Sequence, residues 1–267
     1  MSIPDETAKE PAESHTLDEA SKLPSRLIYE VIRRDGEVEI RRPLASLAWS
    51  GTAAGIMISF SLLGEAIFRT YLPDASHSYL IKNLGYSLGF LVVILGRMQL
   101  FTENTITTVL PILAKPSLRL LGCVARLWLV VLAANVVGAF AVAAFFAYTA
   151  AIPSELLPAI QALSEHAIGM PAGESFWRAI PAGILIAAGD FAHIVAGSVE
   201  MAYLLLRGDL SVGAGLSGFF LPVLAGNIVG GTAIFTVLAW GQVKEEVPRG
   251  LHRVVWRRRG AGPTTIA

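Results

Sequence analysis

The sequence predicts an all-α integral membrane protein, and three observations support this class. Of its 267 residues, 54% are hydrophobic and only 16% are charged, with a mean hydropathy of +0.58, which is too apolar for an ordinary soluble domain. The charges gather at the ends, because residues 1–44 carry 17 and residues 243–267 carry 8 of the total of 42. The body between them divides into apolar blocks long enough to cross a membrane.

The same composition excludes several classes of protein. Disordered chains combine low hydrophobicity with high net charge, whereas this chain is apolar and has a net charge of zero. A single cysteine, Cys123, excludes a disulfide scaffold. Zero net charge gives no general attraction to nucleic acid, so no nucleic-acid partner is expected. The sequence contains no pattern of a nucleophile with a base or of clustered metal ligands, so we predict neither an enzyme nor a cofactor or metal site.

Residues 1–43 are expected to form a cytoplasmic tail. The first 24 residues are acidic and lack the apolar stretch of a signal peptide. Near residues 26–34, apolar side chains fall on one helical face, opposite Arg26, Glu30 and Arg33, which predicts a short amphipathic helix; these apolar residues are Leu27, Ile28, Val31 and Ile32. Such a helix lies on the membrane surface or packs on the rest of the protein, and the sequence favours neither.

Residues 44–242 are expected to form the transmembrane channel domain. A helix rising about 1.5 Å per residue needs about 20 residues to cross a hydrocarbon core of about 30 Å. Five apolar blocks meet or approach that length: 45–68, 84–114, 120–150, 176–206 and 210–242. Polar residues interrupt the second block near Thr102 and the fourth near His193. Non-helical backbone at membrane depth survives only where it is buried in protein or lines a cavity, so the two breaks indicate a transport site.

The two breaks belong to an internal repeat. Ala134-Asn135-Val136-Val137-Gly138 recurs 92 residues later as Gly226-Asn227-Ile228-Val229-Gly230, and the breaks at Thr102 and His193 are 91 residues apart. Each half therefore contains a broken helix followed by a helix with Asn-x-x-Gly, in which Asn135, Gly138 and Gly230 are structural residues. Small residues in the first and third blocks predict close contacts between the subunits of a homo-oligomer; they are Gly51, Ala54, Gly55, Ala133, Ala134 and Gly138.

The basic residues indicate the orientation in the membrane. Lys and Arg precede the first block, occur in the connection 115–119 and fill the basic tail 243–267, whereas the connection 151–175 holds three glutamates and no Lys or Arg. Both tails are therefore expected in the cytoplasm, in a multi-pass protein of the inner or plasma membrane that contacts membrane lipid. Two cytoplasmic tails require an even number of crossings, which conflicts with five apolar blocks.

Three motifs resemble those of the formate/nitrite transporter family. Leu100-Phe101-Thr102-Glu103-Asn104-Thr105 resembles its first broken loop, and Asp190-Phe191-Ala192-His193-Ile194-Val195-Ala196-Gly197 its second, with the central pore histidine. Gly226-Asn227-Ile228-Val229-Gly230-Gly231 is similar to its last helix. The variants look closer to an uncharacterised branch than to dedicated formate channels. The resemblance implies an aquaporin-like bundle of two inverted three-helix repeats, and a homopentamer carrying small monovalent anions such as formate or nitrite, with or without a proton.

Four residues of the two broken loops are candidate pore residues. Burial favours the neutral form of His193 and a neighbouring anion favours its charged form, so His193 can couple anion entry to proton binding; the alternative is a histidine hydrogen-bonded between helices. Thr102 matches the pore-lining threonine of the family and can donate to an anion or cap the half-helix that follows. Leu100 and Phe101 match an apolar constriction that gates by dewetting, or serve only in packing.

Other polar residues leave the charge of the substrate open. Asn135 is expected to bridge backbone groups freed by a broken helix, and the resemblance makes Asn227 a partner of His193. Carboxylates lie in or beside the breaks, at Glu103, Asp190 and Glu200, and an ionised carboxylate repels anions. If these groups are ionised in the pore, a small neutral solute or a cation is the better substrate. His166, in the connection 151–175, is interpreted as a loop residue.

The second repeat is shortened between the fourth and fifth helices of the family pattern. Between Phe176 and Ala188 there are about 13 residues, roughly 20 Å of helix, which is less than a crossing. Formate channels place an asparagine on the fourth helix where this chain has Gly183. Residues 176–206 are therefore expected to form one long interrupted helix or a shortened pair, leaving the six-helix pattern about one crossing short and the second half of the pore incomplete. A non-transporting membrane protein is thus also possible.

Overall fold

The computed structural model describes residues 25–73, 78–182 and 191–243, and these form helices with no β-strand among them. The helices of the first half are α2 (Ser25–Ile40), α3 (Leu44–Met57), α4 (Ser59–Tyr71), α5 (Ser78–Leu84), α6 (Ser87–Leu95), α7 (Phe101–Thr107) and α8 (Leu110–Ala114). Those of the second half are α9 (Leu118–Tyr148), a 3₁₀ turn (Ser154–Leu156), α10 (Leu157–Ile168), α11 (Ala172–Ala182) and α12 (Ile194–Arg207). A last long helix contains α13 (Val212–Ala214), a π-helical segment (Gly215–Phe220), α14 (Leu221–Ile228), a second π-helical segment (Val229–Thr236) and α15 (Val237–Val243).

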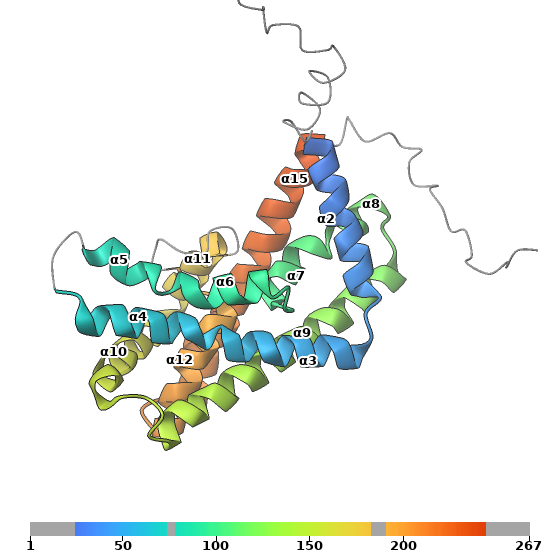
Figure 1. The fold of residues 1–267 in the computed structure, drawn as a ribbon. Helices are drawn as coiled ribbons and strands as arrows, with labels where there is room; N and C mark the ends of the chain where they lie inside the picture. The colour runs from blue at the N-terminus through green and yellow to red at the C-terminus, as the bar shows by residue number, and fades with distance from the viewer. Residues whose placement is uncertain (1–24, 74–77, 183–190, 244–267) are drawn as a thin grey trace, which may run out of the picture.

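Four helical stretches of the described chain are long and apolar enough to cross a membrane. They are Leu44–Tyr71, Ser78–Leu95, Leu118–Tyr148 and Val212–Val243 (Figure 1). The second continues through a break into α7 and α8. The fourth apolar block, 176–206, does not form a single span, because its described residues belong to the separate helices α11 and α12. Four candidate spans in the described chain are an even number, as the expectation of two cytoplasmic tails requires.

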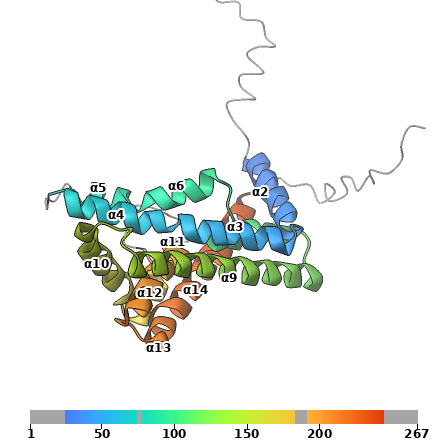
Figure 2. The same ribbon diagram turned by 60° about the horizontal axis from the view of Figure 1, so that its bottom comes forward.

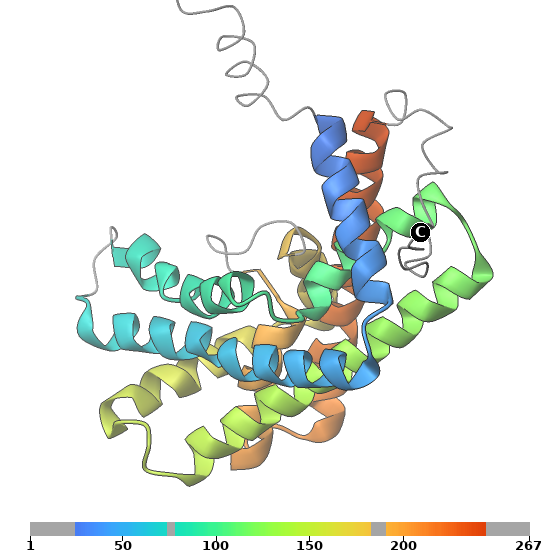
Figure 3. The same cartoon turned by 45° about the vertical axis from the view of Figure 1, so that its right-hand side comes forward.

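The N-terminal helix is present and longer than the stretch 26–34 predicted for it. Tyr29 and Ile32 pack against Leu110 of α8 and Val243 of α15, so this face of α2 packs on the protein. A Cβ on Gly36 would lie 2.1 Å from the carbonyl oxygen of Thr107, which shows how closely α2 approaches α7. Figure 3 shows α2 and α15 side by side.

A half-buried ion-pair cluster lies at one edge of α2, and apolar side chains lie on its exposed side. Arg33 donates to both carboxylate oxygens of Glu30, at 2.8 and 2.7 Å, and Arg34 donates to the same group at 3.0 Å. These hydrogen bonds lower the pKa of Glu30 to about 2, and those from Arg33 have the largest effect. Three apolar side chains of this helix, Leu27, Ile28 and Val31, are exposed.

The connection 151–175, interpreted from the sequence as a loop, is largely helical. Leu156, Ile160, Leu163 and Ile168 follow each other at intervals of three to five residues, and all four are buried. This stripe seats α10 against α4 and α12. His166 therefore lies on a packed helix and not in a loop.

The small residues of the repeat pack helices within one chain. A Cβ on Gly138 of α9 would lie 2.3 Å from the carbonyl oxygen of Thr52 in α3, and a Cβ on Gly230 would lie 2.1 Å from that of Ile180 in α11. Each Asn-x-x-Gly helix thus meets one partner at backbone contact distance, and α11 is the counterpart of α3. Gly51, Ala54, Gly55, Ala134 and Gly138 are buried in the first of these contacts, so the expectation that they join subunits is wrong.

Helices α11 and α12 enter the protein from one face and return to it. Phe176 lies at Gly226 and Ile180 at Gly230, so α11 runs parallel to the last long helix, whereas α12 begins beside Asn227 and ends near its start. The end of α12 meets the end of α9, where the Tyr148 hydroxyl donates to the Leu206 carbonyl at 2.8 Å. We call this end, with α10, the α10 face; α2, α8 and the end of α15 form the α2 face (Figures 1 and 2).

Candidate pore site

The first broken helix is held by Asn135 from the middle of α9. Its Oδ1 accepts from the backbone N–H of Phe101 at 2.9 Å, while Nδ2 donates to the carbonyls of Gln99 at 2.9 Å and Gly51 at 2.8 Å. Asn135 is fully buried, so no water takes over these contacts. One side chain therefore joins the break, α3 and α9, which are the contacts that a bridging role requires.

The second broken helix is held by Asn227 in the same way. Its Oδ1 accepts from the N–H of Ile194 at 2.9 Å, and Nδ2 donates to the carbonyls of Ala179 at 2.8 Å and Ala192 at 3.1 Å. Asn227 is also fully buried. It contacts the residues on both sides of His193 rather than the imidazole, so it fixes the backbone from which His193 projects.

The paired asparagines locate the shortening of the second repeat. In the first repeat the two carbonyls held by Asn135 belong to Gly51 and Gln99, which are 48 positions apart. In the second repeat those held by Asn227 belong to Ala179 and Ala192, which are only 13 positions apart. The residues that α4, α5 and α6 supply in the first half therefore have no full counterpart in the second. The segment 183–190, including Gly183 and Asp190, lies outside the described residues.

The two breaks meet at Thr102 and His193. Thr102 Oγ1 and His193 Nε2 lie 2.9 Å apart, and both residues are buried. The other ring nitrogen, Nδ1, accepts from the N–H of Ala196 at 3.3 Å and caps α12. Because Nδ1 acts as an acceptor, the neutral ring carries its hydrogen on Nε2 and donates it to Thr102.

Aromatic side chains adjoin this contact. Phe90 of α6 meets the His193 ring edge to face at 4.9 Å, and Tyr86 lies 5.5 Å from Phe90. The sequence analysis identified neither residue. Phe90 lies on α6, which is apolar on all sides and so has no periodicity that selects a face, and Tyr86 directly precedes this helix. Phe101 packs instead on Trp128 of α9 at 5.9 Å, and Leu100 is buried in the core beside it; neither lines the cavity described next.

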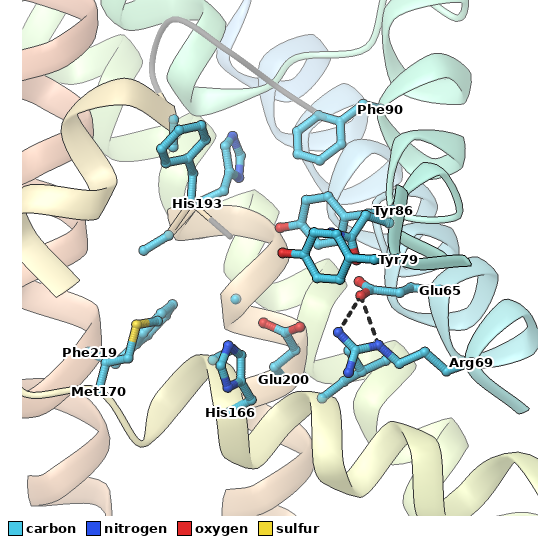
Figure 4. Close-up of a pocket in the computed structure, with 17 residues that line it drawn as sticks. Glu65, Arg69, Tyr79, Tyr86, Phe90, His166, Met170, His193, Glu200 and Phe219 are labelled. Carbon is cyan, nitrogen blue, oxygen red and sulfur yellow. Dashed lines mark hydrogen bonds and ion pairs between the residues drawn. The ribbon is translucent and has the colours of Figure 1, made fainter. Parts of the chain in front are cut away.

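A cavity of about 300 Å³ leads from His193 toward the α10 face. We call it the His193 cavity; Figure 4 shows His193 and Phe90 at one end and His166, Glu200 and Arg69 toward the other. Its polar lining comes from α4, α5, α10 and α12 and from the residues that precede α6 and α12. These polar residues are Glu65, Arg69, Tyr79, Asn83, Tyr86, His166, His193 and Glu200. Arg69 donates to Glu65 Oε1 at 2.9 and 3.0 Å.

The three candidate carboxylates have different places. Glu200 is 6% exposed and lines the cavity two helical turns from His193. Glu103, on α7, is exposed and does not line the cavity. Asp190 belongs to the segment outside the described residues. Among the described residues, no group of three or more His, Cys, Asp or Glu side chains is arranged to hold a metal ion.

Known proteins are similar to this chain in sequence. A family model described as formate/nitrite transporter matches residues 26–189 and 184–241, two parts that meet where the repeat is shortened. The inner membrane protein YfdC of Escherichia coli (strain K12) is 38% identical over 266 residues, covering 90% of this chain and 86% of that protein.

Two solved structures share the fold. A pentameric formate channel with formate bound has a TM-score of 0.60 at 19% identity, covering 79% of this chain and 99% of that one. An ion channel of the same family has a TM-score of 0.59 at 17% identity, covering 82% and 98%. The family match spans most of the chain and confirms the resemblance carried by the three motifs. This chain belongs to the formate/nitrite transporter family.

Proposed function

We propose that this protein is a channel for small monovalent anions of the formate and nitrite type, with a proton carried through His193. Membership of a transporter family confirms that it is a membrane transport protein and not an enzyme. The observation that carries the proposal is the 2.9 Å contact between Thr102 and His193, at the point where both broken helices begin. A solute entering between these side chains meets two hydrogen-bond donors and the positive end of α12.

Proton coupling follows from the hydrogen bonds of His193. Its Nδ1 accepts from Ala196, so a proton added there displaces the bond that caps α12. An anion beside the ring offsets this loss because it attracts the imidazolium. Binding of the anion and of the proton therefore favour each other, as transport of a weak acid requires.

We propose a homopentamer, because a structural relative is described as a pentameric formate channel. Large apolar side chains cover the outside of the spans and suit contact with lipid or with neighbouring subunits; Trp49, Leu95, Leu118 and Leu129 are more than two thirds exposed. We place the α2 face in the cytoplasm, which agrees with the Lys and Arg pattern of the sequence. A mass measured in native detergent that corresponds to a monomer alone would contradict the pentamer.

The proposal is tested by flux into proteoliposomes, with formate, nitrite and glycerol measured in parallel. Formate and nitrite are expected to enter and glycerol to be excluded. Glycerol entry alone would support the alternative of a neutral-solute pore, which the buried Glu200 favours, and no flux of any probe would support a non-transporting protein.

The His193→Asn variant tests the proton coupling. Asparagine retains a hydrogen-bond donor but does not titrate. The protein should therefore fold, while the pH dependence of flux should change. Thr102→Val should lower anion flux more than it lowers stability, because it removes one hydrogen bond worth about 0.5–1.5 kcal/mol. The matched control is Thr107→Val, since Thr107 lies on the same half-helix and bonds only to the carbonyl of Glu103. If the pH dependence of flux is unchanged in His193→Asn, His193 has only a structural role.

A further inference from the structure

An apolar stripe on α2 is left open by the rest of the described chain. Leu27, Ile28 and Val31 are 45%, 49% and 52% exposed, and their spacing places them on one side of the helix. We call these three residues the α2 stripe. Each of them would gain free energy from a partner that covers its exposed half.

The two ends of the described chain meet beside this stripe. Val243, the last described residue, packs on Tyr29 in the first turns of α2. Gln242 donates to the hydroxyl of Ser25 at 3.1 Å, and Ser25 is the first residue of α2. Figure 3 shows α2 and α15 side by side up to these ends. The chain after Val243 and the chain before Ser25 therefore start next to the α2 stripe.

The sequence after Val243 contains a segment that suits the stripe. Leu251, Val254 and Val255 follow each other at the spacing of one helical face, within a segment, 251–259, that also carries four arginines. The seven residues 244–250 can extend to about 24 Å, at 3.3–3.6 Å per residue. This length exceeds the helix diameter of about 10–12 Å, so the segment can reach the exposed side of α2 from Val243.

The sequence before Ser25 supplies the opposite charge. Residues 1–24 contain six acidic and two basic residues, a net charge of −4, whereas residues 244–267 contain six basic and two acidic residues, a net charge of +4. Segments tethered at neighbouring points meet at an effective concentration on the order of mM, so even weak exposed ion pairs favour their association. Apolar surface and acidic residues thus lie together where the basic segment begins.

We propose that the basic segment 251–259 docks on the α2 stripe, with its apolar residues on Leu27, Ile28 and Val31 and its arginines toward the acidic residues of 1–24. Docking covers the stripe and withholds the arginines from anionic lipid, which attracts basic segments that follow a membrane span. This inference concerns the tails of the chain and does not depend on the proposed transport function.

The test measures how fast a thiol in the basic segment is alkylated. In the full-length protein with Cys123→Ser, which leaves no other thiol, Val255→Cys places a small apolar thiol on the docking face. Uncharged iodoacetamide should alkylate it several-fold more slowly than a thiol introduced by Thr264→Cys, which lies outside the segment. Adding Ile28→Ser and Val31→Ser should speed alkylation at position 255 about tenfold, as loss of two half-buried aliphatic contacts predicts.

A matched control and a charge variant accompany this comparison. Leu118→Ser should leave the rate at position 255 unchanged, because Leu118 is also an exposed apolar residue but lies at the start of α9. Asp18→Asn with Glu19→Gln should speed alkylation about two- to threefold, and 1 M salt should have the same effect, since both weaken exposed ion pairs.

Two outcomes would overturn the proposal. Equal alkylation rates at positions 255 and 264 with the native α2 stripe would show that the segment is not docked, and this comparison needs no change in α2. Protection that appears only in nanodiscs containing phosphatidylglycerol, and that does not respond to Ile28→Ser and Val31→Ser, would assign the segment to the lipid surface instead.

Discussion

Replacing Asn227 with alanine tests how the second broken helix is held. The substitution removes the side-chain amide, whose oxygen accepts one hydrogen bond and whose nitrogen donates two. The N–H of Ile194 and the carbonyls of Ala179 and Ala192 then lose this partner. All three groups sit around a fully buried side chain. The alanine methyl group fills only part of the space, so these backbone groups cannot be satisfied without movement of α11 or α12.

The expected loss of stability is large. A buried polar group that loses its partner costs about 1–3 kcal/mol, and three such groups with partial relaxation give roughly 3–5 kcal/mol. For a chain of this size, each kcal/mol lowers the Tm by about 2–4 °C, so a decrease of roughly 10 °C is expected. Flux should be abolished, because the backbone at Ala192 and Ile194 holds His193 against Thr102.

The assay is the thermal unfolding of purified protein in detergent, followed by tryptophan fluorescence. Asn135→Ala is the matched variant, since it removes the same three bonds in the first repeat and should have a similar effect. Asn83→Ala, a change in the cavity wall, is the control for amide loss at a less buried position. A decrease in Tm of less than about 2 °C for Asn227→Ala would refute the reasoning.

Three further outcomes are expected. In a Cys123→Ser background, Ser211→Cys should react with an impermeant thiol reagent from the exterior, while a tag at the C-terminus is reached only from the cytoplasm. An internal Ser211 with an external tag would contradict the re-entrant path of α11 and α12. Gly36→Val should release α2 and speed its proteolysis several-fold while flux-competent spans persist, because a side chain cannot fit 2.1 Å from the Thr107 carbonyl oxygen. The pKa of Glu30 is lowered from 4.5 to about 2 in the folded protein, so its ion pairs contribute fully to stability above pH 4.5. This contribution is lost as the pH falls from 4.5 toward 2. The rate of proteolysis of α2 should therefore be equal at pH 8 and pH 6.

The sequence predicted the centre of the fold better than its periphery. Equal spacing from each break to its Asn-x-x-Gly helix predicted two matching broken helices, and the structure brings Thr102 to His193 at 2.9 Å. The prediction of the two breaks was correct because a polar residue inside an apolar run is conspicuous, and because the repeat marks the break in each half of the chain. Phe90 and the aromatic contact with His193 gave no such signal, since one apolar residue within an apolar helix does not stand out.

The packing of the helices around the cavity could not be predicted from the sequence pattern. Glutamates without lysine or arginine indicated an exterior connection, but they do not reveal the apolar stripe that packs α10 on α4 and α12. His166 was therefore missed as a cavity residue. Small residues in the first and third blocks correctly indicated close helix contact, but a sequence does not say whether the partner helix belongs to the same chain, and here it does.

The shortened repeat accounts for an even number of candidate spans in the described chain, as the expectation of two tails on one side requires. In the first repeat, the chain from Gly51 to Gln99 travels to the α10 face and back to the middle of the protein. A helical excursion from the middle to the opposite face covers about 15 Å, or about ten residues each way, so the 13 positions between Ala179 and Ala192 cannot make the equivalent journey to the α2 face. An excursion from the middle to one face and back starts and ends at the same depth. Its loss therefore does not change whether the number of crossings is even or odd, and the last span keeps its direction across the membrane. Because the three backbone groups held by Asn227 lie outside the lost excursion, the second break can keep its place beside Thr102.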